Sequence, residues 1–140
     1  MGVRVRVLLR KGSRHVETTA LLNTGFESAE PDIVLPARLA EELSMRSETG
    51  DLIRLDTAGG PLECAFIERG LDLELLLADR EGPRITCNVI ISPHEREVLL
   101  SDKVIEELGI QIMSAKSGRW RLRDDPPGLE RPSAEPTYWS

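Results

Sequence analysis

Hydrophobic and polar residues alternate along most of the chain with a period of two, the pattern of β-strands that are buried on one face. Val3, Val5 and Val7 alternate with arginines, a polar turn follows at residues 11–14, and residues 16–22 return. The chain therefore opens with a predicted β-hairpin. The same pattern predicts further strands at residues 32–35, 51–57, 62–67, 71–77, 84–91, 98–100, 110–113 and 119–122.

Two short stretches have the period of an α-helix instead. Residues 37–43 follow Pro36, a residue that suits the first turn of a helix, and they place apolar side chains on one face. Ser101 and Asp102 offer an N-cap for a second helix, which has Val104, Ile105 and Leu108 on one apolar face and ends at Gly109. The sequence therefore predicts an all-β fold, a closed barrel with two short helices.

The length, charge and apolar content of the chain disfavour several classes of function. The chain has 140 residues, which suits one domain, and 18 basic against 24 acidic residues give a formal net charge of −6. A nucleic-acid-binding module would present a basic face, so we expect no nucleic-acid partner. No run approaches the roughly 18 apolar residues of a membrane span, and the start does not resemble a signal peptide. We therefore expect no membrane partner, a cytoplasmic location, and reduced thiols at Cys64 and Cys87.

The last 17 residues differ from the rest of the chain. Residues 124–140 contain four prolines and no apolar periodicity, so we predict a domain at residues 1–123 and a Pro-rich acidic tail at 124–140. The simplest expectation is a solvated tail. The alternative is that the tail adds a strand to a partner or lies in a cleft, with Tyr138 and Trp139 as its anchor.

Several kinds of catalytic site are disfavoured. His15 and His94 both lie in predicted turns, where neither is held against a nucleophile. Two isolated cysteines do not make a zinc site, and no Gly-rich phosphate-binding motif is present. We expect neither a metal nor another cofactor.

One segment carries a candidate site. At residues 20–26 an apolar strand leads directly into Asn23, Thr24, Gly25 and Phe26. The glycine allows a sharp turn, and the Thr24 hydroxyl can form a hydrogen bond to a neighbouring copy of the same loop. This segment resembles the active-site turn of the retropepsin-like aspartic peptidases, in which two apolar residues precede Asp-Thr/Ser-Gly.

The resemblance covers roughly residues 3–113, in the order of that family. Residues 33–43 resemble the strand and helical turn after the motif, and the 51–67 hairpin is similar to the mobile flap, with Ala58, Gly59 and Gly60 at its tip. Residues 98–110 resemble the strand and helix that brace the catalytic loop. Ser101 departs from the glycine found there in many members. The likeness is to small single-lobe members from archaea and bacteria.

The resemblance implies an acid-protease-like barrel that forms a homodimer, with a peptide or protein substrate held between the motif loops and the flaps. One motif supplies half a site, so two chains would meet at Asn23. Phe26 and the flap residues Ala58, Gly59 and Gly60 would contact substrate. Family members carry Asp at position 23, and two such carboxylates activate the attacking water.

Asn23 leaves two interpretations open. An amide cannot exchange the proton that the mechanism needs, so the chain is an aspartic endopeptidase inactivated by Asp-to-Asn replacement, or a natural dimeric peptide-binding module. We favour the first, since Thr24, Gly25 and the flap glycines are intact. Asp56, in Leu-Asp-Thr-Ala, is a competing motif that we interpret as a flap-strand residue. A plain interaction domain with only fold-level likeness remains the third alternative.

Overall fold

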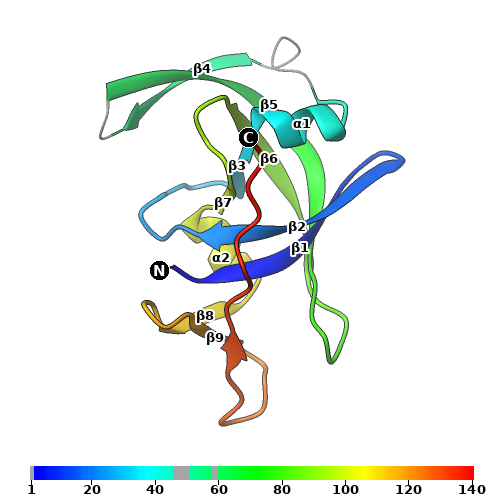
Figure 1. Cartoon of the computed structure of the whole chain (residues 1–140), viewed down its shortest axis with the longest axis vertical. Helices are drawn as coiled ribbons and strands as arrows, with labels where there is room; N and C mark the ends of the chain where they lie inside the picture. The colour runs from blue at the N-terminus through cyan, green and yellow to red at the C-terminus, as the bar shows by residue number, and fades with distance from the viewer. Residues whose placement is uncertain (1, 46–50, 58–59) are drawn as a thin grey trace.

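The computed structural model describes residues 2–45, 51–57 and 60–140 (Figure 1). These residues form ten strands and two short helices, in the order β1 (Arg4–Lys11), β2 (Arg14–Leu22), β3 (Asp32–Pro36), α1 (Ala37–Glu42), β4 (Asp51–Thr57), β5 (Gly60–Leu75), β6 (Arg84–Ser92), β7 (Val98–Leu100), α2 (Asp102–Glu107), β8 (Ile110–Ser114), β9 (Arg119–Leu122) and β10 (Arg131–Pro132). No helix in the described part of the chain is long and apolar enough to cross a membrane. Both predicted helices and most predicted strands are confirmed, but the two strands expected at residues 62–67 and 71–77 form the single strand β5, and β10 has no predicted counterpart.

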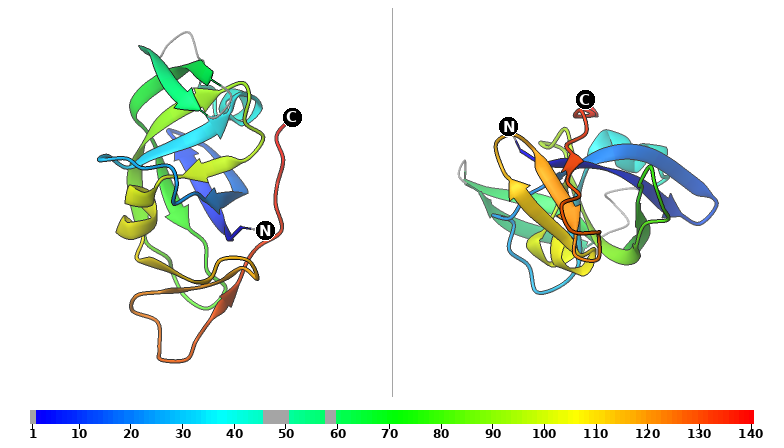
Figure 2. Two further views of the ribbon diagram at one scale, coloured as in Figure 1. Left: turned by 90° about the vertical axis from the view of Figure 1, so that its left-hand side faces the viewer. Right: turned by 90° about the horizontal axis from the view of Figure 1, so that it is seen from below.

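Six strands close into a barrel, as the sequence predicts. The sheet has the order β1-β2-β7-β3-β6-β5-β4, and β5 also pairs with β1, which closes the ring and leaves β4 outside it. β8, β9 and β10 form a separate three-stranded sheet. Figure 2 shows the β4–β5 hairpin at one end of the barrel and the small sheet at the other. β7 lies between β2, with which it is parallel, and β3, with which it is antiparallel.

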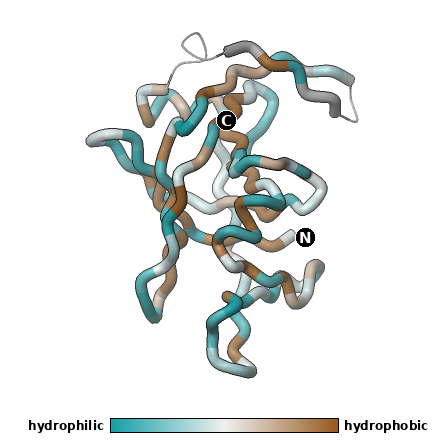
Figure 3. The backbone as a smooth tube through the Cα atoms, turned by 180° about the vertical axis from the view of Figure 1, so that it is seen from behind, coloured by the Kyte–Doolittle hydropathy of each residue, from teal (hydrophilic) through white to brown (hydrophobic). Residues whose placement is uncertain are grey.

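The barrel is filled by aliphatic side chains, as the low aromatic content predicts. On β1, Val5, Val7 and Leu9 are buried while the residues between them are more exposed, because side chains alternate across a strand. Hydrophobic segments accordingly lie along the strands in Figure 3, and hydrophilic segments lie mostly in the connections. The interior position of these side chains explains the arginine–valine alternation at the start of the sequence.

Three strands instead have apolar residues on both faces. β3, β6 and β7 each contain an uninterrupted apolar run, at residues 33–35, 89–91 and 98–100. The outer members of each run belong to the barrel core, whereas Val34, Ile90 and Leu99 belong to a second apolar cluster on the other face. A strand that is buried on both faces has a continuous run of apolar residues rather than an alternation. The runs in β3, β6 and β7 therefore indicate a second apolar surface, on the outer face of the barrel.

β5 is longer than predicted. The sequence suggests two strands, at residues 62–67 and 71–77, whereas the structure has one 16-residue strand with a register shift between Ile67 and Leu71. Arg69 has a φ of 49°, in the left-handed region, so residues 68–70 form a bulge rather than a turn. The bulge separates the half of β5 that pairs with β4 from the half that pairs with β1.

The expectation of a solvated C-terminal tail is wrong. β10 pairs with β9, and the remaining segment runs along the barrel (Figure 1). The Thr137 backbone N–H donates to Thr19 Oγ1 at 2.9 Å, and the Trp139 indole Nε1 donates to Thr18 Oγ1 at 3.0 Å. Tyr138 remains half exposed beneath the guanidinium of Arg96. The tail therefore donates hydrogen bonds to the hydroxyl groups of two buried threonines of β2. Both threonines precede the residues of β2 that pair with β7.

A buried carboxylate fixes the start of this tail. The side chain of Asp125 is fully buried and accepts hydrogen bonds from the Leu122 backbone and from the guanidinium groups of Arg80 and Arg131. Arg131 also pairs with Asp79 at 2.7 Å, in the connection between β5 and β6. The hydrogen bond from Arg131 is the main reason why the pKa of Asp125 lies well below its ordinary value.

Asp125→Asn is expected to destabilise the protein. The amide nitrogen would replace an oxygen that now accepts from arginine, so the half-buried Arg131 would keep only Asp79 as a carboxylate partner, at a cost on the order of 3 kcal/mol. The free energy of unfolding in urea measures this loss. Asp124→Asn is the matched control, since Asp124 also pairs with Arg80 but is exposed. Equal losses for the two variants would contradict the structural role of Asp125.

Stability is expected to depend on pH through the same carboxylate. Because folding lowers the pKa of Asp125, the unfolded chain takes up the proton first as the pH falls. The contribution is complete above the ordinary carboxyl pKa of about 3.9 and is lost progressively below it. The difference in unfolding free energy between the parent protein and Asp125→Asn should therefore be constant near neutrality and shrink on acidification. A difference that grows in acid would contradict this sign.

Candidate functional site

The Asn23 turn begins directly after β2. The Asn23 backbone N–H donates to the Leu100 carbonyl of β7 at 3.0 Å, and its carbonyl accepts from the Phe26 N–H at 3.0 Å. The side-chain Oδ1 accepts from the Gly25 N–H at 3.2 Å. Asn23 is thus half-buried and held on both sides, in a turn stabilised by its own side chain.

Thr24 and Gly25, in contrast, face solvent. Over residues 2–45, 51–57 and 60–140, the Thr24 hydroxyl makes no hydrogen bond within the chain. Gly25 does not have a positive φ, and an added Cβ would meet only Asn23 Oδ1, at 3.4 Å. The chain does turn sharply here, since the Phe26 N–H donates to the Asn23 carbonyl, but the turn does not use the positive φ that would require glycine. The position is open toward solvent, where a second molecule can approach the backbone.

β7 and α2 lie behind the turn. Leu22 of β2 is in register with Leu100 of β7, and the next residue, Ser101, is the N-cap of α2. The Asp102 N–H donates to the Phe26 carbonyl at 3.0 Å, and Asp102 Oδ1 accepts from the Ser28 N–H at 2.9 Å. The Ser101 hydroxyl accepts from the third residue of its helix, so a serine fits the place of glycine.

An apolar cluster joins the turn to the β4–β5 hairpin. Val34, Cys64 and Ile90 are its buried centre. Four partly exposed side chains pack against them: Phe26 of the loop, Ile53 of β4, Phe66 of β5 and Leu99 of β7. The loop after β2 and the free end of the hairpin lie on the same side of the molecule, the left in Figure 1. The cluster is therefore a partly exposed apolar surface that the loop and the hairpin share.

The hairpin carries the remaining predicted residues. Gly60 begins β5 opposite Thr57, with a φ of 111° that favours glycine. Ala58 and Gly59, the other expected flap residues, lie outside the described residues. Asp56 lies within β4, in register with Pro61, and not at the start of a loop. The competing motif is therefore part of the hairpin, as predicted.

Other reactive groups are poorly placed for catalysis. His15 on β2 and His94 in the turn after β6 are both exposed. Cys64 and Cys87 are free but buried, and burial raises the pKa of both thiols, that of Cys87 to about 12. Within the described ranges, no group of three His, Cys, Asp or Glu side chains could hold a metal ion.

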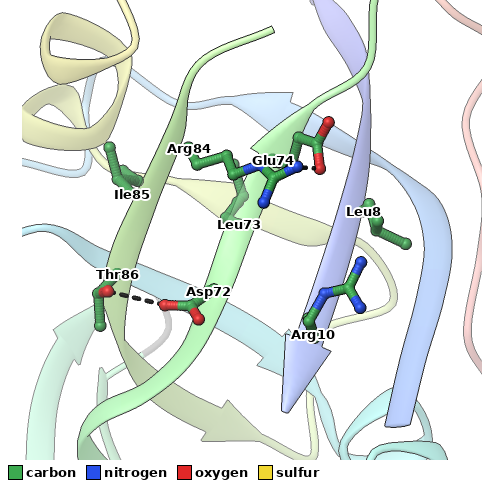
Figure 4. A pocket seen from close by; sticks show the side chains of 8 residues that line it. All are labelled: Leu8, Arg10, Asp72, Leu73, Glu74, Arg84, Ile85 and Thr86. Atoms are coloured by element: carbon green, nitrogen blue, oxygen red, sulfur yellow. Dashed lines mark hydrogen bonds and ion pairs between the residues drawn. The ribbon is translucent and has the colours of Figure 1, made fainter. Parts of the chain in front are cut away.

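A cavity of about 280 Å³ lies elsewhere, between β1, β5 and β6 (Figure 4). Its lining residues Leu8 and Arg10 belong to the end of the β1–β2 hairpin remote from Asn23. Two of its carboxylates already have partners, since Asp72 accepts from Thr86 at 2.7 Å and Glu74 pairs with Arg84 at 3.2 Å. These polar groups are thus paired with one another, as they are on an ordinary solvent-facing sheet surface.

Comparison with known proteins adds no identification: no protein-family model matches the chain, and no curated protein matches it either. The functional argument therefore depends on the geometry of the Asn23 turn and its surroundings.

Sequence reasoning missed the polar residues that hold the loop. Asp32 accepts hydrogen bonds from the side chains of Ser28 and Asn88, and Asp102 accepts from the Ser28 backbone. Asn88 had a signal that could have found it, because it is an amide inside the otherwise apolar run of β6. Asp32 and Asp102 had none, since both begin a predicted element, where acidic residues are common.

Asp102→Ala is expected to loosen the loop. The Ser28 amide would lose its acceptor, which should cost about 1 kcal/mol and accelerate hydrogen exchange at Ser28. NMR-detected amide exchange measures this effect residue by residue. Lys103→Ala, which removes only an ion pair with Glu107 on the same helix, should leave Ser28 unchanged. Equal exchange at Ser28 in both variants would rule out the anchoring role of Asp102.

Proposed function

We propose that the chain is one half of a homodimeric aspartic endopeptidase site, present here in an inactive form because position 23 is Asn. The observation that carries the proposal is the exposed Asn23-Thr24-Gly25 turn at the edge of a partly exposed apolar cluster beneath a β-hairpin. The turn supplies the reacting position, and the cluster supplies an apolar surface for substrate side chains.

Two copies are needed because each chain has one such turn. At a two-fold axis, the open Gly25 backbone and the Thr24 hydroxyl of each chain would face their counterparts. The hydroxyl has no hydrogen-bond partner among the described residues of its own chain, so a second copy can provide one. The backbone bonds to β7 hold Asn23 in place for such a meeting.

The chemistry follows from placing two carboxylates at position 23. Two Asp side chains about 3 Å apart cannot both ionise, so one remains protonated and the other is a base. The base takes a proton from water, which attacks the scissile carbonyl while the protonated partner donates to the carbonyl oxygen. The pair titrates as a unit. Asn23 preserves the shape and the bond from the Gly25 N–H but cannot take up the proton.

Substrate would lie as an extended strand between turn and hairpin. Main-chain hydrogen bonds would hold it, and alternate side chains would contact the apolar cluster. Phe26, Phe66 and Leu99 are the partly exposed members nearest to the loop and the strands below it, so we expect apolar residues beside the cleaved bond. The hairpin residues Ala58, Gly59 and Gly60 would close over the peptide.

A second candidate function is peptide binding without catalysis. Asn23 itself favours it, because its Oδ1 accepts from the Gly25 N–H and its backbone bonds hold a stable turn that has no general base. The same dimer and cleft would then bind an extended peptide and release it uncut.

Asn23→Asp is expected to create peptidase activity. Cleavage of a denatured protein between about pH 3 and pH 7 should exceed that of the parent chain by a factor on the order of 10³, since a general base is restored. Asp56→Asn in the Asn23→Asp background is the matched control and should retain activity. If neither form cuts while both are dimers that bind peptide, the second candidate function replaces the first.

A further inference from the structure

We propose that Asn88 is a positioning residue that ties the base of the β4–β5 hairpin to the loop carrying Asn23. The proposal rests on the function inferred above, and it adds a residue far from the turn to the machinery of the site. Asn88 lies on β6, is 8% exposed, and contacts three different elements through hydrogen bonds.

The first contact is with the bulge in β5. Between the pairs Ile67–Val89 and Leu71–Cys87, β5 advances four residues while β6 advances two. Asn88 lies opposite the two extra residues of β5, where the regular backbone hydrogen bonds between the two strands are interrupted. Its Oδ1 accepts from the Arg69 N–H at 2.9 Å, so the side chain takes the place of a missing backbone acceptor.

The bulge is a rigid junction. Arg69 has a φ of 49°, a conformation that an arginine adopts only when its surroundings fix it. At Gly70, an added Cβ would lie 2.9 Å from Val89 Cγ2 and 3.0 Å from Met45 Cε, so the backbone is closely packed there. The orientation of the hairpin arm relative to the barrel is thus set at the residues that Asn88 contacts.

The second contact leads to the loop. Asn88 Nδ2 donates to Asp32 Oδ1 at 2.9 Å, and the other oxygen of Asp32 accepts from the Ser28 hydroxyl. The Ser28 hydroxyl accepts in turn from the Glu30 N–H, while the Asn88 N–H donates to the Pro31 carbonyl. Every polar atom of the Asn88 amide group is therefore used, one toward the hairpin and one toward the loop.

Beyond Ser28 the contacts reach the turn itself. The Ser28 N–H donates to Asp102, whose own N–H donates to the Phe26 carbonyl, and the Phe26 N–H donates to Asn23. A continuous series of hydrogen bonds joins Arg69 to Asn23. The orientation of the hairpin arm at the bulge and the placement of residue 23 are thereby linked through one amide.

The test uses an isosteric change that breaks one of the two side-chain contacts. In Asn88→Asp, one oxygen still accepts from the Arg69 N–H, but the other faces the Asp32 carboxylate and repels it. Amide exchange at Ser28 and Glu30 should accelerate about tenfold, whereas exchange at Arg69 should change little. Thr86→Ala, which removes a β5–β6 side-chain contact on the exposed face, is the control and should leave all three amides unchanged.

A rescue variant separates positioning from general destabilisation. In the double variant Asn88→Asp with Asp32→Asn, the amide at 32 donates to the carboxylate at 88 and still accepts from Ser28. Exchange at Ser28 and Glu30 should return to the parental rate. Failure of the rescue, or faster exchange of equal size in Thr86→Ala, would overturn the proposal.

Kinetics in the Asn23→Asp background give a second readout. Asn88→Asp should lower kcat about tenfold with less change in KM, because the turn is misplaced while the apolar cluster is intact. The double variant should recover kcat. If Asn23→Asp shows no cleavage at all, the proposed function fails, but the exchange experiment still decides whether Asn88 couples hairpin and loop.

Discussion

The structure depends on three strands that must be covered on both faces. β3, β6 and β7 fill the barrel with one set of aliphatic side chains and present Val34, Ile90 and Leu99 on the other side. Burying one face closes the barrel, but the second face stays exposed to water unless another element covers it. The β4–β5 hairpin and Phe26 cover it in part, and the remainder is a partly exposed apolar surface, on which the proposed peptide binding depends.

The same three strands position the Asn23 turn. β7 lies between β2 and β3, so the chain leaving β2 must loop outward before it returns as β3, and Asn23 is the first residue of that excursion. Backbone bonds to Leu100 and side-chain bonds to Asp32 and Asp102 hold the loop where it emerges beside the apolar surface. Placement of the turn is therefore a consequence of strand order.

Local patterns predict the elements well and their long-range contacts poorly. The alternation at the start of β1 and the apolar run at residues 98–100 both identify strands. They do so because the faces of a strand that are buried determine which of its own residues are apolar. The bulge at Arg69 is missed because the polar residues Glu68 and Arg69 interrupt the apolar alternation, which makes one strand look like two. The tail reads as solvated because the contacts that fix it to the barrel, Asp125 with Arg80 and Trp139 with Thr18, join residues far apart in sequence. Asn88 is missed for the same reason.

The proposed function requires two Asn23 turns to meet at a two-fold axis, and disulfide trapping detects such a meeting. Thr24→Cys places an exposed thiol on the turn, while the native Cys64 and Cys87 are buried. Cysteines join only when their Cα atoms lie within about 7 Å, so mild oxidation should give a covalent dimer. Ser13→Cys, at the remote end of the β1–β2 hairpin, should stay monomeric under denaturing electrophoresis. Equal cross-linking of both variants, or of neither, would contradict the account.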